Sequence, residues 1–337
     1  MENKLIVSTS PHIRGKANTK NIMLKVIIAL IPISVFSLIM FGLSVLWIFM
    51  ASIGGALLGE YLMQKGRRLP VTLDDGSAFL TGLLLALTLP PNLPWWIAAV
   101  GGLTATVLGK QIFGGLGHNI FNPALVGRAV IFVSWAAYFS RSYVQSLSIS
   151  IANTSAHKHI IDAVGGATPL AAMHAVYDPV GASVPQGLFS SNYYGPLFFA
   201  NPWGCIGEIS ALLLILGGIF LIVTRIIDWR IPVTYVGTVA VLTAFTGRDP
   251  LFYILTGGLL LGAIYMATDY TTSPLSAGGK IVFGFGLGLI TFLLRFWSHY
   301  PEGVMFSILF MNGTVPLIDR YVLPRKYGRL RPGEEVG

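Results

Sequence analysis

The chain has 337 residues, of which 54% are hydrophobic and only 11% charged, and its formal net charge is +8. A soluble domain has about 25% charged residues, so this composition excludes an ordinary water-soluble core. The apolar residues form blocks of about 20 rather than alternating along strands, which predicts an all-α integral membrane protein and not a β-barrel. Membrane orientation explains the positive charge, and we expect no nucleic-acid partner.

About ten apolar segments follow one another along the chain, and each predicts a transmembrane helix. Several are short for a full span and lie beside Gly or Pro, which predicts short or broken helices in a protein-lined interior. In chain order the expected spans are 21–41, 43–63, 77–90, 95–109, 123–138, 204–224, 231–246, 252–267, 281–296 and 304–323.

The basic residues show which side of the membrane each loop faces. Most Lys and Arg residues, including Lys110, fall on the same side as the N-terminus, and few, including Arg295, fall on the other. Cytoplasmic loops are enriched in Lys and Arg, so both termini are expected in the cytoplasm. The expected organisation is a cytoplasmic segment 1–20, a first five-helix repeat 21–138, an extracytoplasmic loop 139–203, a second repeat 204–323 and a basic cytoplasmic tail 324–337.

The two halves resemble each other around one short motif. Asp74 precedes Thr81 by seven residues, and Asp249 precedes Thr256 by the same interval; Gly follows each threonine. Five spans in each half require the second copy to run inverted. Inverted repeats commonly place a binding site or ion path near mid-membrane where the copies meet. Chance similarity between two helices rich in Gly and Leu is the alternative.

The candidates for a functional charge inside the membrane are four residues within the expected spans: Lys25, Glu60, Arg128 and Glu208. Intramembrane charge often marks function. Each of the four lies near a predicted helix end, however, so we expect surface or snorkelling positions.

Asp74 and Asp75 precede the third span, where they fit either a cation site or stabilisation of a helix N-terminus, and we favour the second. The single cysteine, Cys205, cannot by itself ligate an iron–sulfur cluster or a structural zinc, and we expect no metal site.

The long polar loop contains the run DAVGGATPL at residues 162–170. The small residues at 165–167 leave space before the Thr168 hydroxyl and free backbone N–H groups to approach an anionic phosphate. Pro169 restricts Thr168 to extended conformations, which would hold its side chain outward. The residues alone leave two interpretations open: an ordinary turn with no functional role, or a phosphoester at Thr168.

Asp162, Gly166, Ala167 and Thr168 match the pattern D-x-x-[ST]-G-A-T, at which the NqrB/RnfD family carries covalently bound FMN. Gly165 stands where the family usually has Ser or Thr, but it is not the attachment point. Three further stretches resemble this family, and the resemblance covers nearly the whole chain: Ser10–His12, Gly117–Ala124 and Ala267–Pro274.

The resemblance implies a multi-pass subunit of the Rnf complex in the bacterial inner membrane, with FMN esterified to Thr168 on the outer face. Such a subunit relays electrons between ferredoxin and NAD and couples this to Na⁺ or H⁺ transport. The implied partners are RnfA, RnfB, RnfC, RnfE and RnfG, and the flavin of RnfG is the expected exchange partner.

A second, non-covalent flavin (riboflavin) is also associated with this family. The candidates for holding it, or for an ion path, are polar residues at helix ends: Asn119, Asn122, Asp269, Thr271 and Thr272. Starting or stopping helices is their alternative role.

The chain has no Walker sequence and no GxGxxG after a strand, so NAD is expected on another subunit, and no complete active site is expected here. Two alternatives are the B subunit of a Na⁺-translocating NADH:quinone reductase and a solute channel without a redox group.

Overall fold

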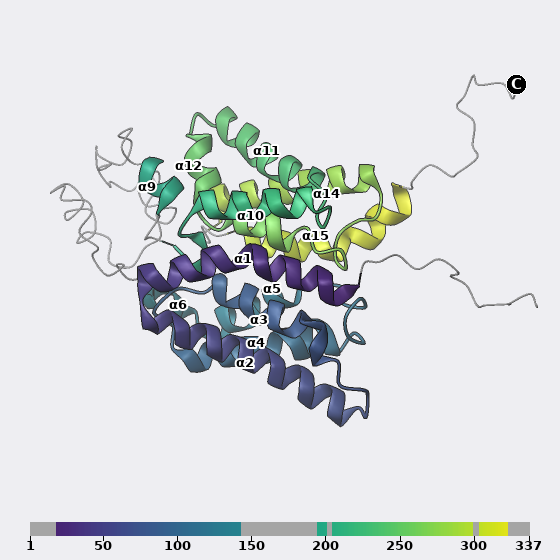
Figure 1. Ribbon diagram of the computed structural model, residues 1–337. Coiled ribbons are helices and arrows are strands. Elements are labelled where there is room, and N and C mark those ends of the chain that lie inside the picture. Colours follow the sequence, from purple (N-terminus) through teal and green to yellow (C-terminus); the bar gives the residue numbers. More distant parts are fainter. Residues whose placement is uncertain (1–17, 143–193, 201–203, 299–302, 323–337) are drawn as a thin grey trace, which may run out of the picture.

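The computed structural model describes residues 18–142, 194–200, 204–298 and 303–322, and every regular element within these ranges is a helix. Figure 1 shows two groups of helices, with the elements from α1 to α6 below and those from α10 to α15 above. The expected all-helical fold is therefore confirmed for the part of the chain that the structure describes.

The first group opens with two long helices that are separated by Gly42 alone. The φ of Gly42 is 79°, in the left-handed region that favours glycine. A 3₁₀ turn, Leu73–Asp75, leads into the third helix, and a π-helical turn, Val107–Gln111, extends the fourth. The helices are α1 (Thr19–Phe41), α2 (Leu43–Gly66), α3 (Ser77–Leu87), α4 (Trp95–Thr106), α5 (Pro123–Ser134) and α6 (Ala136–Ser142).

The second group contains the most interrupted helix of the described residues. Here α12 and α13 are separated by Thr256, Gly257 and Gly258, and both glycines have a φ of 68°. A π-helical turn, Gly262–Met266, follows α13. The other helices are continuous. The elements are α9 (Tyr194–Phe199), α10 (Ala211–Val223), α11 (Arg230–Phe245), α12 (Pro250–Leu255), α13 (Leu259–Leu261), α14 (Ala277–Trp297) and α15 (Val304–Tyr321), with a 3₁₀ turn at Ile206–Glu208 before α10.

Small residues bring the main helix pairs into close contact. In the first group α2 packs most extensively on α4, and a Cβ at Gly102 would overlap the Ser52 carbonyl oxygen. In the second group α11 packs on α14, and a Cβ at Gly288 would lie 2.5 Å from Cβ of Thr238. Such close approach through small residues is typical of helices that associate within a membrane.

The two groups meet through α1 against α10 and through α5 against α15. Gly217 permits the first contact, because a Cβ there would lie 2.7 Å from the Ala29 carbonyl oxygen. In Figure 1 the start of α1 and the end of α15 lie at one end of the molecule, and α6 and α9 lie at the other. The chain therefore enters and leaves the helical body at the same end.

Three described helices, α1, α2 and α14, are long and apolar enough to cross a membrane by length and composition. Four shorter apolar helices accompany them: α3, α5, α10 and α11. On α1 the side chains of Leu24, Ile31 and Ile39 are exposed, as expected for a surface that faces lipid. These features are those of a multi-pass membrane protein.

The structure corrects the expected position of several charges. Lys25 is exposed, as expected, but Glu60, Arg128 and Glu208 are buried rather than snorkelling. Lys110 and Arg295, which we assigned to the inner and outer faces of the membrane, are also buried. Charges near the ends of apolar segments can be taken inside when a partner is near, which hydropathy does not reveal.

Candidate functional site

The covalent-flavin motif lies outside the described residues. Asp162, Gly166, Ala167, Thr168 and Pro169 all fall in the range 143–193. The attachment of FMN at Thr168 therefore stays a prediction. The described helices on either side of that range, α6 and α9, lie at the same end of the molecule in Figure 1.

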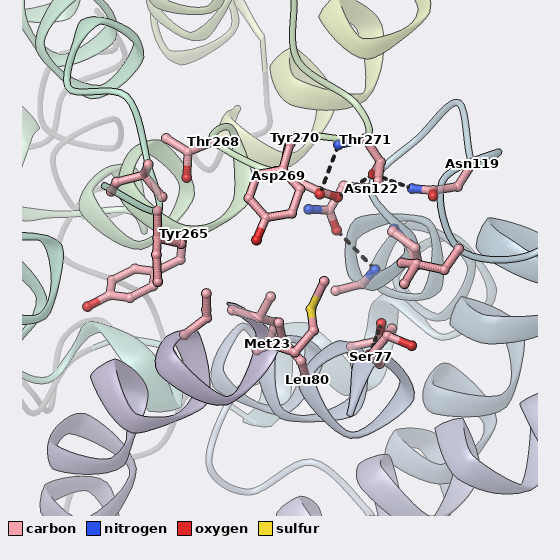
Figure 2. Close-up of a pocket in the computed structure, with 18 of the residues that line it drawn as sticks. Met23, Ser77, Leu80, Asn119, Asn122, Tyr265, Thr268, Asp269, Tyr270 and Thr271 are labelled. Atoms are coloured by element: carbon pink, nitrogen blue, oxygen red, sulfur yellow. Dashed lines mark hydrogen bonds between the residues drawn. The ribbon is translucent and has the colours of Figure 1, made fainter. Parts of the chain in front are cut away.

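A pocket of about 700 Å³, its open mouth included, lies between the two groups of helices. Figure 2 shows that its walls come from both: Met23, Ser77 and Leu80 from the first, and Tyr265 and Asp269 from the second. Binding pockets for small molecules are mostly apolar with a few polar groups. The residues that line this pocket have that character.

Four of the five predicted second-site residues line this pocket: Asn119, Asn122, Asp269 and Thr271. They come from segments 119–122 and 269–271, which are far apart in the sequence. Asn119 Nδ2 joins the two segments by donating to Thr271 Oγ1 at 2.9 Å. The sequence therefore identified a real polar cluster, although it could not show that the two runs meet.

Asn122 fixes the position of the first segment. Its Oδ1 accepts from the backbone N–H of Ala124 at 3.0 Å and caps α5, and Pro123 occupies the first helical position. Its Nδ2 donates to the Met266 carbonyl at 3.2 Å, where the π-helical turn ends. The predicted helix-start role of Asn122 is thus confirmed, and the same side chain also ties the two halves together.

Asp269 fixes the position of the second segment. Its carboxylate accepts from the backbone N–H and the hydroxyl of Thr271, at 3.2 and 3.0 Å. Burial raises the pKa of Asp269, while these two hydrogen bonds act in the opposite direction. Burial, with the neighbouring Asp269 charge, also raises the pKa of Tyr270 to about 12. The pocket therefore has a carboxyl group that is easier to protonate than usual.

Thr272 differs from the other four candidates because it does not line the pocket. It is buried behind them, and its carbonyl accepts from the Asn312 amide at 3.1 Å. Asn312 also accepts from the Asn122 N–H at 3.0 Å. Thr272 and Asn312 therefore lie behind the residues that line the pocket and are hydrogen-bonded to one another, and Asn312 is also hydrogen-bonded to Asn122.

Asn119 leaves one acceptor available at the pocket wall. Its Oδ1 is buried and has no hydrogen-bond partner among the described residues. A buried amide oxygen without a donor costs about 1–3 kcal/mol, so a ligand that donates to it would gain that energy. The residues present therefore fit a ligand with an N–H or O–H group.

A buried ion pair adjoins the pocket. Lys110 Nζ lies 2.7 and 2.9 Å from the two carboxylate oxygens of Glu60, and both side chains are only 1% exposed. Glu60 Oε1 also accepts from the side chains of Gln64 at 3.1 Å and Gln111 at 3.0 Å. Lys110 lies in the π-helical turn and lines the pocket. Such turns are frequent at functional sites.

The chain matches the NQR2, RnfD, RnfE family over residues 6–328. It belongs to this family. One similar member is the D subunit of the Na⁺-translocating ferredoxin:NAD⁺ oxidoreductase complex of Acetobacterium woodii, at 42% identity over 97% of this chain and 96% of the relative. Another is the D subunit of the proton-translocating ferredoxin:NAD⁺ oxidoreductase complex of Clostridium ljungdahlii, at 41% identity over 98% of both chains. The D subunit of the ion-translocating oxidoreductase complex of Stutzerimonas stutzeri is 38% identical over 95% of both chains.

The Glu60–Lys110 pair of this NQR2, RnfD, RnfE family member was not predicted from the sequence. The available signal was two opposite charges, each a few residues from the end of an apolar stretch. Buried charges in membrane proteins usually pair with one another, so their combination could have suggested the contact. Nothing in the spacing, however, shows that residues 60 and 110 are neighbours.

Proposed function

We propose that this protein is the D subunit of an Rnf-type complex that moves electrons between ferredoxin and NAD and couples this to cation transport. The supporting observation is similarity over nearly the full length of relatives that are named as this subunit. Its partners are then RnfA, RnfB, RnfC, RnfE and RnfG. The relatives from Acetobacterium woodii and Clostridium ljungdahlii are named for different ions, Na⁺ and H⁺, at nearly equal identity to this chain.

In this proposal the protein crosses the membrane about ten times as two inverted five-helix repeats. The packing supports this: the second helix of each half packs most extensively on the fourth, as α2 on α4 and α11 on α14. The first helices of the halves, α1 and α10, also contact each other, as do the last, α5 and α15. A pseudo-two-fold axis between inverted copies would produce this pattern.

FMN is esterified to Thr168 in this proposal, on the extracytoplasmic face. The motif around Thr168 supports the attachment. The outer position is supported by Figure 1, where α6 and α9 lie at the end of the molecule opposite the start of α1 and the end of α15. With both termini cytoplasmic, the flavin could exchange electrons with a partner on the outer side. A covalent bond would keep it from being lost there.

The pocket between the halves holds the second, non-covalent flavin. An isoalloxazine ring has an N–H group beside carbonyl oxygens, and Asn119 Oδ1 is an acceptor that needs such a donor. Tyr265 and Tyr270 contribute aromatic surface to the same pocket. A bound flavin supplies one- and two-electron chemistry, and the protein supplies its position and electrostatics.

Flavin extraction tests the pocket directly. The protein is purified with Thr168→Val, which removes the covalent attachment site, then denatured, and the released flavin is identified by chromatography. We expect riboflavin in this sample. In Asn119→Ala the protein should bind riboflavin at least about tenfold more weakly, because one buried hydrogen bond is lost. Asn92→Ala, at an exposed loop position, is the matched control. Absence of released flavin would contradict the second-flavin proposal.

A further inference from the structure

A chain of hydrogen bonds connects the buried ion pair to the edge of the pocket. Lys110 Nζ donates to Ser77 Oγ at 2.5 Å, and Ser77 Oγ donates to Asp75 Oδ1 at 2.6 Å. Ser77 is 4% exposed, whereas Asp75 is half-buried and sits in the turn before α3. The chain therefore runs from a carboxylate that water can reach to groups that water cannot.

Ser77 is the hydroxyl of this chain that lines the pocket. Figure 2 shows Ser77 at the pocket wall, and Lys110 lines the pocket as well. Two other pocket hydroxyls donate to the backbone: Thr81 to the Ser77 carbonyl at 2.9 Å and Thr268 to the Ile264 carbonyl at 2.6 Å. The Ser77 hydroxyl instead bonds a carboxylate and can turn from it toward a ligand.

We propose that Asp75 and Ser77 form a proton relay that protonates the flavin in the pocket when the flavin is reduced, an inference that rests on the second flavin proposed above. The electron comes from the electron donor of the complex. The Asp75 carboxylate takes a proton from water at the cytoplasmic end. Ser77 then transfers its hydroxyl proton to a ring nitrogen and takes the proton that Asp75 has gained, which leaves Asp75 a carboxylate again. The net change is one electron and one proton added to the ring, with both side chains restored.

Lys110 and Glu60 act as positioning residues for this relay. The ammonium group of Lys110 is held by both Glu60 oxygens, so it stays beside Ser77 Oγ. A cation at this distance stabilises the negative charge that develops on Ser77 as its proton leaves. The hydroxyl is therefore a better proton donor than an isolated serine.

Other charged groups near the pocket could provide a different path for the proton. Asp74 is exposed beside Asp75, and Asp269 faces the pocket from the second half, where it accepts from Thr271. Thr271 also accepts from Asn119, so its hydroxyl is held on both sides. An alternative relay through Thr271 and Asp269 is the main competitor, and Asp269→Asn tests it.

Two variants distinguish proton transfer by Asp75 from a purely structural role of this residue. Asp75 Oδ1 accepts from the backbone N–H of Ser77 at 2.8 Å, which stabilises the start of α3. Asp75→Asn keeps this acceptor but removes the proton that the carboxyl group would pass on. Ser77→Ala removes the hydroxyl itself.

The experiment uses the full chain carrying Thr168→Val, so that the pocket flavin alone absorbs. Dithionite is mixed rapidly with the oxidised protein, and the spectrum shows whether the one-electron-reduced flavin is protonated (blue) or not (red). The rate of protonation is compared in Ser77→Ala, Asp75→Asn and Asp269→Asn. Ser52→Ala, a buried serine that bonds the Gly82 carbonyl at 2.8 Å, is the matched control.

We expect flavin content to be unchanged in Asp75→Asn and protonation to slow about 100-fold in Asp75→Asn and Ser77→Ala, as for loss of a general acid. Ser52→Ala should protonate like the parent. Equal rates in the parent and both relay variants would overturn the relay but leave the pocket flavin established. Slowing only in Asp269→Asn would assign the relay to the other wall. Absence of flavin in the parent protein would overturn the pocket proposal and the relay together.

Discussion

Separating Glu60 from Lys110 should be among the most damaging single changes to the described part of the protein. The two charges are 2.7 Å apart and each is 1% exposed. Lys110→Met leaves the Glu60 carboxylate buried with only the amides of Gln64 and Gln111 as donors. Removing one partner of a buried ion pair typically costs about 3–5 kcal/mol, because the remaining charge is uncompensated. We expect this loss of stability for Lys110→Met and for Glu60→Gln.

The double variant, Glu60→Gln with Lys110→Met, gives the sharper test. It leaves no buried charge at this position, so it should lose less stability than either single variant. Stability is measured for all four proteins in one detergent by thermal or SDS-induced unfolding. Losses that simply add in the double variant would show that the two side chains do not interact and would refute the ion-pair argument.

Three further changes probe other parts of the fold. Arg295 is fully buried, and its guanidinium group donates to the carbonyls of Tyr253, at 2.6 Å, Thr256 and Gly257 around the α12–α13 break. Lysine cannot reach several carbonyls at once. Arg295→Lys should therefore lose about 2 kcal/mol of stability in the same unfolding assay. Gly102→Ala should destabilise by about 1–3 kcal/mol because α2 and α4 must separate, whereas Gly54→Ala, with open space around it, should not. Asp228 is partly buried, which alone would raise its pKa, but the Arg230 N–H and Lys280 lower the pKa overall. The stabilisation by Asp228 is therefore present above the unfolded pKa, about 3.9, and lost as the pH falls through the lower folded value. Asp228→Asn should cost less than about 1 kcal/mol at pH 7, and the difference from the parent should shrink as the pH is lowered below about 3.9.

The positions of the helices could be predicted from the sequence to a large extent. Long apolar stretches predicted α1, α2 and α14 with ends close to those observed. The reason is that a helix crossing the membrane must be apolar over about the thickness of the hydrocarbon core, so the apolar stretch marks the helix. The expected broken helices are also present, most clearly where Gly257 and Gly258 interrupt the segment 250–266. Two adjacent glycines are a local feature of the sequence, so the break in this helix could be predicted without the structure.

The assembly of the site could be predicted only in part. Asn119 and Thr271 were singled out separately, but their 2.9 Å hydrogen bond depends on how the two halves pack, which no local pattern specifies. Lys110 and Arg295 were expected at the membrane faces, because a charge near the end of an apolar stretch usually reaches water. Their burial depends on partners about 50 and 40 residues away: Glu60 and the carbonyls of the α12–α13 break.

A flavin bound covalently at Thr168 would make this chain a redox subunit in its own right. The most direct test is in-gel flavin fluorescence of the protein purified from its native host and denatured in detergent. We predict a fluorescent band for the natural sequence and a dark band of equal protein content for Thr168→Val. A natural protein that stays dark, or a Thr168→Val protein that still fluoresces, would contradict covalent attachment at this residue.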